Sequence, residues 1–258
     1  MQQKLPRKIS PITSRMQSGQ LRHCDFCDEF SGGLENSFAV RYQNTIPSRV
    51  VLSTANFRVV PSLGQIIEGY LLIVPVSHYT AVADMPTELT GELSELCSYV
   101  RTVLVKVYGP CVFFEHGVRG SEAGGCGIDH AHLHAVPSAS SSQPMEYLKD
   151  NHALKAIGGI SEIHKEVSRS SPYLYYEETN GKAWTCEIGF IPSQYVRKLI
   201  AESLGVISWD WRECGREQAL LGSIARLSEF FRSDSAGALE APKDCPAQSS
   251  RAVAAATA

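Results

Sequence analysis

The feature that most constrains the fold is an eleven-residue run, Ile128–Ser138, in which three histidines alternate with small or apolar residues. The histidines are His130, His132 and His134. Successive side chains of a β-strand point to opposite faces, so an extended run predicts all three imidazoles on one face. The sequence therefore predicts a strand with one apolar face and one face that carries chemistry.

The spacing of these histidines limits what they do together. At a strand rise of about 3.3 Å per residue, neighbouring imidazoles start roughly 7 Å apart and the outer pair roughly 13 Å apart. Without a bend they cannot all bind one ion, so we expect them to have separate roles. A single strand histidine is usually structural, but three in strict alternation would be costly to bury without a function.

Composition excludes several classes of protein. The chain has 258 residues, is 43% hydrophobic and 20% charged, and carries a formal charge of −3, which is typical of one globular domain with elaborations. This charge gives no general attraction to nucleic acid or to an anionic membrane, so phosphate recognition must be local. No apolar stretch is long enough for a membrane span or a signal peptide. We therefore expect a cytoplasmic protein without nucleic-acid or membrane partners.

Eight cysteines in such a chain are expected to be thiols or metal ligands rather than disulfides. Cys24 and Cys27 alone have a ligand-like spacing, which fits either a redox pair or half of a metal site. The residues before Cys24 lack the strand pattern that usually precedes a redox pair, and zinc would need two more ligands. The remaining cysteines are interpreted as ordinary thiols: Cys97, Cys111, Cys126, Cys186, Cys214 and Cys245.

Short strand patterns without intervening helices predict an antiparallel sheet. These patterns cover residues 37–42, 50–53, 57–60, 70–74 and 111–115. A helix is predicted from Pro86 to Val107, where apolar residues recur at intervals of three and four. We expect it to pack on one face of the sheet.

The region after the histidine run predicts an elaboration, residues 141–232, packed on a main domain of residues 21–140. It contains helical patterns at 145–157, 193–204 and 217–231, and a hairpin of 173–177 with 183–188 around Asn180 and Gly181. Residues 1–20 are predicted to be a flexible arm and residues 233–258 a disordered tail.

Five glycines fall between Gly117 and Gly127, directly before the histidine run. Glycine lets backbone N–H groups approach an anion closely, which suits a phosphate-binding loop. Such loops are more often simple turns, so the signal is weak by itself.

The motif His-x-His-x-His resembles the histidine triad (HIT) superfamily, whose members transfer or hydrolyse nucleotides. Three further features occur in the order expected for it: Cys24-x-x-Cys27, the segment Gly69–His78 and the glycine loop. The resemblance covers roughly residues 20–138. It implies an α+β fold with a HIT-like antiparallel sheet forming a half-barrel, a long packing helix and a C-terminal α/β elaboration.

Zinc-binding members of the family imply a ligand set of Cys24, Cys27, His78 and His130. Cys₂His₂ is a closed tetrahedral set, so a zinc ion there would be structural rather than catalytic. The alternative is that the cysteines are free thiols and His78 is a surface residue.

The resemblance gives His132 the role of nucleophile at the α-phosphorus of a nucleotide, provided that its other ring nitrogen donates to a carbonyl group. His134 would hold a phosphate oxygen or protonate the leaving group. His116 stands where many relatives have an asparagine, which puts in doubt whether this position makes the contact that the asparagine makes. Further phosphate contacts are predicted from the loop that includes Arg119, Gly124, Gly125, Cys126 and Gly127, although a loop arginine is more often solvated. Gln194 and Arg197 either close the pocket or lie on the surface.

The leading hypothesis is an enzyme that hydrolyses or transfers a nucleoside monophosphate, with purines favoured by family habit. A complete third histidine resembles the hydrolase branches more than the phosphorylase branch. The alternative is a nucleotide-binding regulatory module with weak catalysis, and a redox or catalytic metal protein ranks third. The resemblance also implies a homodimer. The sequence itself offers only the apolar stripe of Leu89 to Val107 as an interface, and the core of a single chain could bury that stripe instead.

Overall fold

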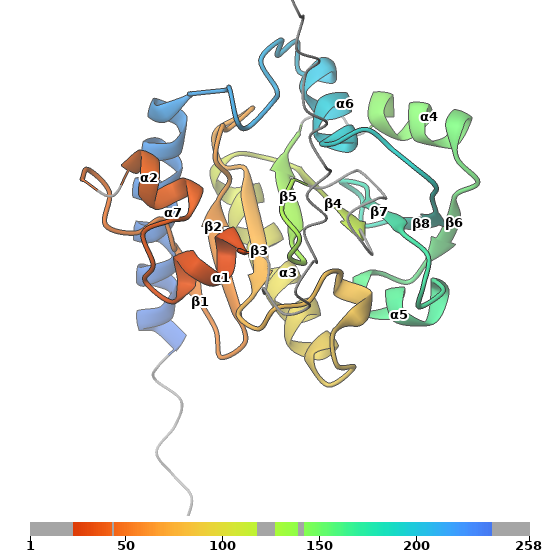
Figure 1. The fold of residues 1–258 in the computed structure, drawn as a ribbon, viewed down its shortest axis with the longest axis horizontal. Coiled ribbons are helices and arrows are strands. Elements are labelled where there is room, and N and C mark those ends of the chain that lie inside the picture. The colour runs from red at the N-terminus through yellow and green to blue at the C-terminus, as the bar shows by residue number, and fades with distance from the viewer. Residues whose placement is uncertain (1–22, 43, 118–126, 139–141, 239–258) are drawn as a thin grey trace, which may run out of the picture.

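The computed structural model describes residues 23–42, 44–117, 127–138 and 142–238 (Figure 1). Its strands form one open sheet in the order β1-β2-β3-β5-β4-β7-β8-β6, and every neighbouring pair is antiparallel. The strands are β1 (Leu52–Ser53), β2 (Phe57–Pro61), β3 (Leu71–Pro75), β4 (Cys111–Gly117), β5 (Leu133–Pro137), β6 (Lys155–Ile157), β7 (Tyr173–Glu177) and β8 (Ala183–Glu187).

Helices cover both faces of this sheet, which confirms the predicted α+β class. The helices are α1 (Asp25–Phe30), α2 (Ser37–Tyr42), α3 (Leu89–Val107), α4 (Ser142–Asn151), α5 (Ile163–Glu166), α6 (Tyr195–Ser203) and α7 (Glu217–Ala238), with 3₁₀ turns η1 (Val82–Asp84) and η2 (Ile160–Glu162). The predicted packing helix is confirmed as α3, although it begins three residues after Pro86.

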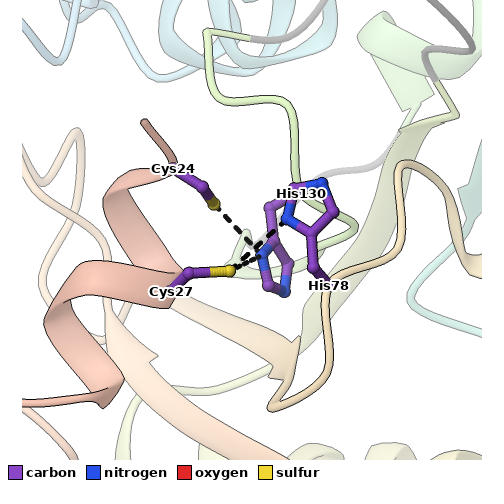
Figure 2. A group of neighbouring side chains, drawn as sticks. All are labelled: Cys24, Cys27, His78 and His130. Carbon is purple, nitrogen blue, oxygen red and sulfur yellow. Dashed lines mark hydrogen bonds between the residues drawn. The ribbon is translucent and has the colours of Figure 1, made fainter. Parts of the chain in front are cut away.

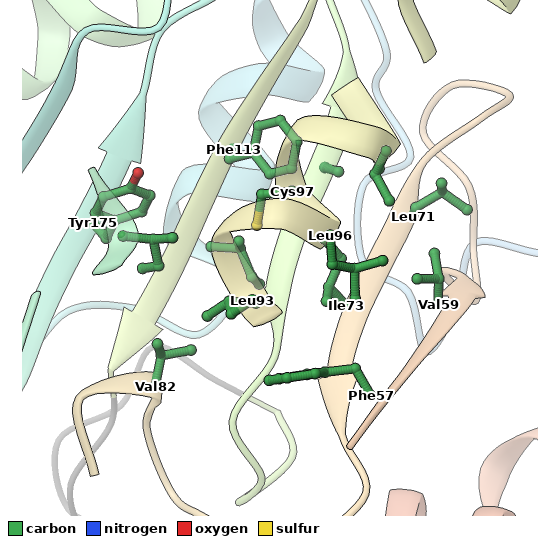
Figure 3. Close-up of a cluster of buried hydrophobic side chains, with 14 of the residues drawn as sticks. Phe57, Val59, Leu71, Ile73, Val82, Leu93, Leu96, Cys97, Phe113 and Tyr175 are labelled. Atoms are coloured by element: carbon green, nitrogen blue, oxygen red, sulfur yellow. The ribbon is translucent and has the colours of Figure 1, made fainter. Parts of the chain in front are cut away.

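Strand alternation divides the core into two layers. On the face that α3 covers, Phe113, Leu133 and Tyr175 pack with the apolar stripe of α3 (Figure 3). Burying one such side chain stabilises the fold by about 1.5–3 kcal/mol relative to exposing it. The stripe of α3 is therefore consumed within this chain's own core, and dimerisation remains a prediction.

The opposite face is covered by α1, α4 and α6. Phe26 of α1, Leu148 of α4 and Ile200 of α6 are each almost fully buried there against the sheet. His132 and His134 belong to this side, because Ala131, Leu133 and Ala135, which alternate with them, pack toward α3. The predicted alternation, with the apolar residues on one face and these histidines on the other, is therefore confirmed.

The strand predicted at 37–42 is wrong, because these residues form helix α2. The side chain of Asn36 accepts a hydrogen bond from the backbone N–H of Ala39 (2.8 Å), which caps the first turn of a helix. Phe38, Ala39 and Tyr42 are buried, and this spacing is helical. In so short a segment, the spacing of the apolar residues fits both the two-residue period of a strand and the 3.6-residue period of a helix.

The strand of the histidine run is shorter than predicted, because β5 begins only at Leu133. Upstream of it, Ala131 N–H donates to the carbonyl of Tyr79 (2.6 Å) and the side chain of His130 donates to the carbonyl of Pro75 (2.9 Å). These bonds replace the strand pairing. They hold the ring of His130 between the end of β3 and the cysteines of the N-terminal segment.

Other boundaries differ by a few residues. The helix predicted at 145–157 is α4 followed by strand β6, which pairs with β8. Helix α7 continues to Ala238, past the predicted start of the tail at Ser233. The predicted arm of residues 1–20 lies outside the described residues, and no helix among those described is long and apolar enough to cross a membrane.

Two glycines offer opposite tests of this fold. Gly69 has a φ of +87°, and an added Cβ would lie 2.5 Å from the ring of Tyr108, whereas the exposed Gly91 of α3 has open space around it. We expect Gly69→Ala to lower the free energy of unfolding by about 1–3 kcal/mol. Gly91→Ala should raise it by about 0.5–1 kcal/mol because alanine is the better helix former. Urea unfolding measures both, and equal effects would contradict the fold.

Candidate metal centre and nucleotide pocket

Four potential ligands converge beside helix α1. The sulfur atoms of Cys24 and Cys27 and ring nitrogens of His78 and His130 all lie within 4.8 Å of one another (Figure 2). Nδ1 of His130 lies 3.3 Å from Sγ of Cys24 and 3.6 Å from Sγ of Cys27, and Nδ1 of His78 lies 3.4 Å from Sγ of Cys27. With zinc bonds of about 2.0–2.3 Å, the edges of a tetrahedron are about 3.3–3.8 Å. The four residues are therefore compatible with zinc.

The surroundings of the cluster also suit a cation. Nε2 of His130 donates to the carbonyl of Pro75, which places the lone pair on Nδ1, facing the cysteines. Burial lowers the pKa of His130 to about 4, so its imidazole is neutral. Burial and the neighbouring Cys24 raise the pKa of Cys27 to about 11. Two adjacent thiols that resist ionisation are the kind of pair that a divalent cation stabilises as thiolates.

Phe26 contacts the rings of both His130 and His132, with ring centres 5.6 and 5.5 Å away. The side chain of His132 is the next potential functional group along the chain. Its Nδ1 donates to the carbonyl oxygen of His130 at 2.6 Å, which fixes the neutral tautomer with the lone pair on Nε2. Its side chain is buried, and burial is the main cause that lowers its pKa. The carbonyl bond expected from the sequence is therefore present.

His134 lies next to His132, with ring centres 4.8 Å apart. It stacks on Phe114 at 4.2 Å, and its Nδ1 is 2.7 Å from the hydroxyl of Tyr70. Burial, followed by the charges of its neighbours, holds its pKa well below the usual value, so His134 is neutral. Nε2 of His116 accepts a hydrogen bond from the N–H of Val196 in α6 (3.3 Å).

These three histidines line a pocket of about 530 Å³, counted with its open mouth. Its apolar wall includes Phe26, Leu63, Leu72 and Trp211. The mixture of an apolar wall with a few polar groups is typical of small-ligand sites.

The structure separates the predicted site residues into two groups. The four ligand candidates form the cluster, and His116, Gly127, His132 and His134 line the pocket together with Gln194 and Arg197. Four residues predicted to contact phosphate lie outside the described residues: Arg119, Gly124, Gly125 and Cys126.

Sequence reasoning missed Glu115, a buried carboxylate in strand β4. It accepts hydrogen bonds from the N–H of Val82 (2.7 Å) and the hydroxyl of Tyr173 (2.6 Å). It thereby fixes the segment that follows His78 to the sheet. A charged residue directly after the apolar run Cys111–Phe114 was the available signal.

Comparisons with known proteins found relatives of low sequence identity. No family model matches the chain. CWF19-like protein 1 of Xenopus laevis is 24% identical over 169 residues, which are 60% of this chain but only 30% of that protein. A HIT family protein from Bacillus anthracis is 18% identical and covers 57% of this chain and 99% of its own, with a TM-score of 0.36. A zinc-bound histidine triad family protein from Mycobacterium smegmatis is 16% identical and covers 46% and 78%, with a TM-score of 0.34. These structural neighbours are histidine triad proteins.

Glu115 predicts a pH dependence of stability. Burial raises the pKa of Glu115 from 4.5 to about 7. Between these two pH values the folded state keeps the proton of Glu115, whereas the unfolded state has lost it. Its contribution to stability is therefore lost as the pH rises through the window, by about 1 kcal/mol per pH unit. Glu115→Gln lacks this titrating group. We therefore expect its free energy of unfolding, relative to that of the parent, to rise by about 1 kcal/mol for each pH unit between pH 5 and 7. Urea titrations measure it, and the exposed Glu95→Gln should give no such slope.

Proposed function

We propose that this chain is a nucleotide hydrolase or nucleotidyltransferase that acts at the α-phosphate through a covalent nucleotidyl-histidine on His132. The observation that carries the proposal is the 2.6 Å hydrogen bond from Nδ1 of His132 to the carbonyl of His130, inside a pocket suited to a small ligand. This bond directs the lone pair of a neutral imidazole to Nε2, which is the requirement for a nitrogen nucleophile.

The reaction has two displacements at phosphorus. In the first, Nε2 of His132 forms a bond to the α-phosphorus, and the bond from phosphorus to the leaving group breaks. The leaving group keeps the electron pair and takes up a proton. In the second, water or another acceptor attacks the phosphorus and loses a proton, and the bond to Nε2 breaks, which restores the neutral imidazole. Hydrolysis and transfer differ only in this acceptor.

His134 fits the role of a phosphate ligand better than that of a general acid. Its low pKa keeps it neutral at physiological pH, and a neutral imidazole is a weak proton donor. With the hydroxyl of Tyr70 donating to Nδ1, the hydrogen stays on Nε2, where it can donate to a phosphoryl oxygen. We propose the same kind of contact for the backbone N–H of Gly127 and for residues of the preceding loop.

We further propose that Cys24, Cys27, His78 and His130 hold a structural zinc ion. When bound, it supplies electrostatic crosslinking of four protein ligands and no open coordination position. The protein residues orient the neighbouring groups. His130 joins the N-terminal segment to β3 through the carbonyl of Pro75, and its own carbonyl orients His132.

The zinc proposal predicts about one equivalent of zinc per chain in protein purified without chelator. Cys27→Ser should lose most of it and lower the melting temperature, because the binding free energy of a structural zinc contributes to folding. Elemental analysis and thermal unfolding measure these effects. Cys186→Ala, a buried cysteine away from the cluster, should keep its zinc. A parent protein with less than about a tenth of an equivalent would contradict the proposal.

The catalytic proposal predicts that His132→Asn abolishes the covalent intermediate. We expect no protein labelling by α-³²P-labelled nucleotide after acid quench, and loss of turnover, with fold and metal content retained. His152→Gln, a histidine outside the pocket, should label and turn over like the parent. A variant that still turned over at the parent rate would indicate direct attack by water.

His134→Asn should have a milder effect than His132→Asn. Loss of an assisting hydrogen bond or proton donor costs about 10²–10⁴ in rate, whereas the nucleophile is required for this route. Single-turnover kinetics separate the two variants. A parent protein that binds nucleotides, but neither labels nor turns over on any nucleotide conjugate, would favour the regulatory module instead.

A further inference from the structure

Two arginines among the described residues, Arg49 and Arg197, line the pocket, and they differ in whether a carboxylate pairs with them. Arg49 is buried and forms a two-pronged ion pair with Glu29, at 2.8 and 2.7 Å, so its charge is neutralised within the protein. Arg197 is equally buried, with 3% of its surface exposed, but it pairs with no carboxylate among the described residues. A buried charge without a counterion is costly unless a ligand compensates it.

Neutral acceptors hold Arg197 in place. Nε donates to the carbonyl of Trp209 (2.5 Å), and the two terminal nitrogens donate to the hydroxyl of Ser62 (3.3 Å) and the carbonyl of Gly64. These bonds use three of the five N–H groups of a guanidinium. Within the described part of the chain, one N–H on each terminal nitrogen is left for another acceptor. Such a fork matches two oxygens of a phosphate.

The position of Arg197 places this charge on the histidine side of the pocket. Its guanidinium lies 5.1 Å from the ring centre of Tyr70, whose hydroxyl is bonded to His134. Its charge is among the causes that lower the pKa of His134, although burial is the largest. Val196, the preceding residue, donates to His116. The first turn of α6 therefore contacts this group of histidines directly.

Two carboxylates near this region form no ion pair with Arg197. The pKa of Asp210 is lowered mainly by its hydrogen bond from the side chain of Gln194 (2.8 Å) and less by the charges of Arg212, 3.8 Å away, and Arg197. Asp25 lines the pocket and accepts from the N–H of Ser37 (3.3 Å). Among the described residues, Arg197 thus keeps a buried positive charge without an ion pair at the pocket, which suits an anionic ligand.

We propose that Arg197, which the C-terminal elaboration supplies, binds the phosphate group of the nucleotide. The proposal rests on the nucleotide site proposed above and adds a residue outside the histidine run to it. The elaboration is then part of the site, because α6 delivers a cation to the pocket, whereas the other arginine among the described lining residues, Arg49, is already paired with Glu29.

The test compares ligands that differ only in the phosphate. Calorimetry measures the affinities of AMP and GMP and of adenosine and guanosine for the parent protein and for Arg197→Met. We expect the monophosphates to bind about 10- to 100-fold more weakly to the variant, since a hydrogen-bonded charge pair has that value. The nucleosides should change by less than about 2-fold. Arg197→Lys, which keeps the charge but not the fork, should lie between the two.

The control is Arg226→Met, because Arg226 lies on α7 with its side chain 63% exposed. It should leave all affinities unchanged. A merely structural role of Arg197 would weaken nucleoside and monophosphate equally, and this outcome would overturn the proposal. If Arg197→Met does not fold, Arg197→Lys is measured instead, and an unchanged ratio of the two affinities overturns the proposal equally. A parent protein that binds none of the ligands would instead contradict the nucleotide site itself.

Discussion

His130 joins the two halves of the site, and the arrangement of both depends on its three contacts. Its Nε2 bonds to the carbonyl of Pro75 at the end of β3, its Nδ1 faces Cys24 and Cys27, and its own carbonyl accepts from His132. One residue therefore connects the N-terminal helix, the sheet and the proposed nucleophile. Any shift of the cysteine cluster would be transmitted to the orientation of His132 through a single peptide group.

The proposed chemistry also depends on burial. His132 and His134 lie in a pocket wall where desolvation lowers their pKa values, and a protonated imidazole could not act as a nucleophile. The same wall carries the positive charge of Arg197, which disfavours protonation of His134 further. A neutral nucleophile and a fixed cation together are suited to an anionic, electrophilic phosphorus.

The C-terminal region is not an appended unit, because its strands continue the main sheet. Strand β7 pairs with β4 along five residue pairs, from Phe113 with Glu177 to Gly117 with Tyr173. Helix α6 then returns over the face of the sheet that carries the histidines, where Val196 donates to His116 and Arg197 lines the pocket. This packing explains how a region outside the resemblance to the histidine triad superfamily contributes to the same pocket.

The sequence by itself determined the elements with a strong period and the residues with a distinctive chemistry. The stripe of α3, the hairpin of β7 and β8, and the separation of the alternating histidines from the apolar face were all predicted from spacing. Short segments were not determined, since Phe38 to Tyr42 fits a strand or a helix until Asn36 caps it. Only the tertiary structure decided where β5 begins, because that depends on the bonds that Pro75 and Tyr79 make with residues more than fifty positions away. It also decided that Arg49 is neutralised and Arg197 is not, because the counterion of a buried charge is chosen by packing and not by neighbours in the chain.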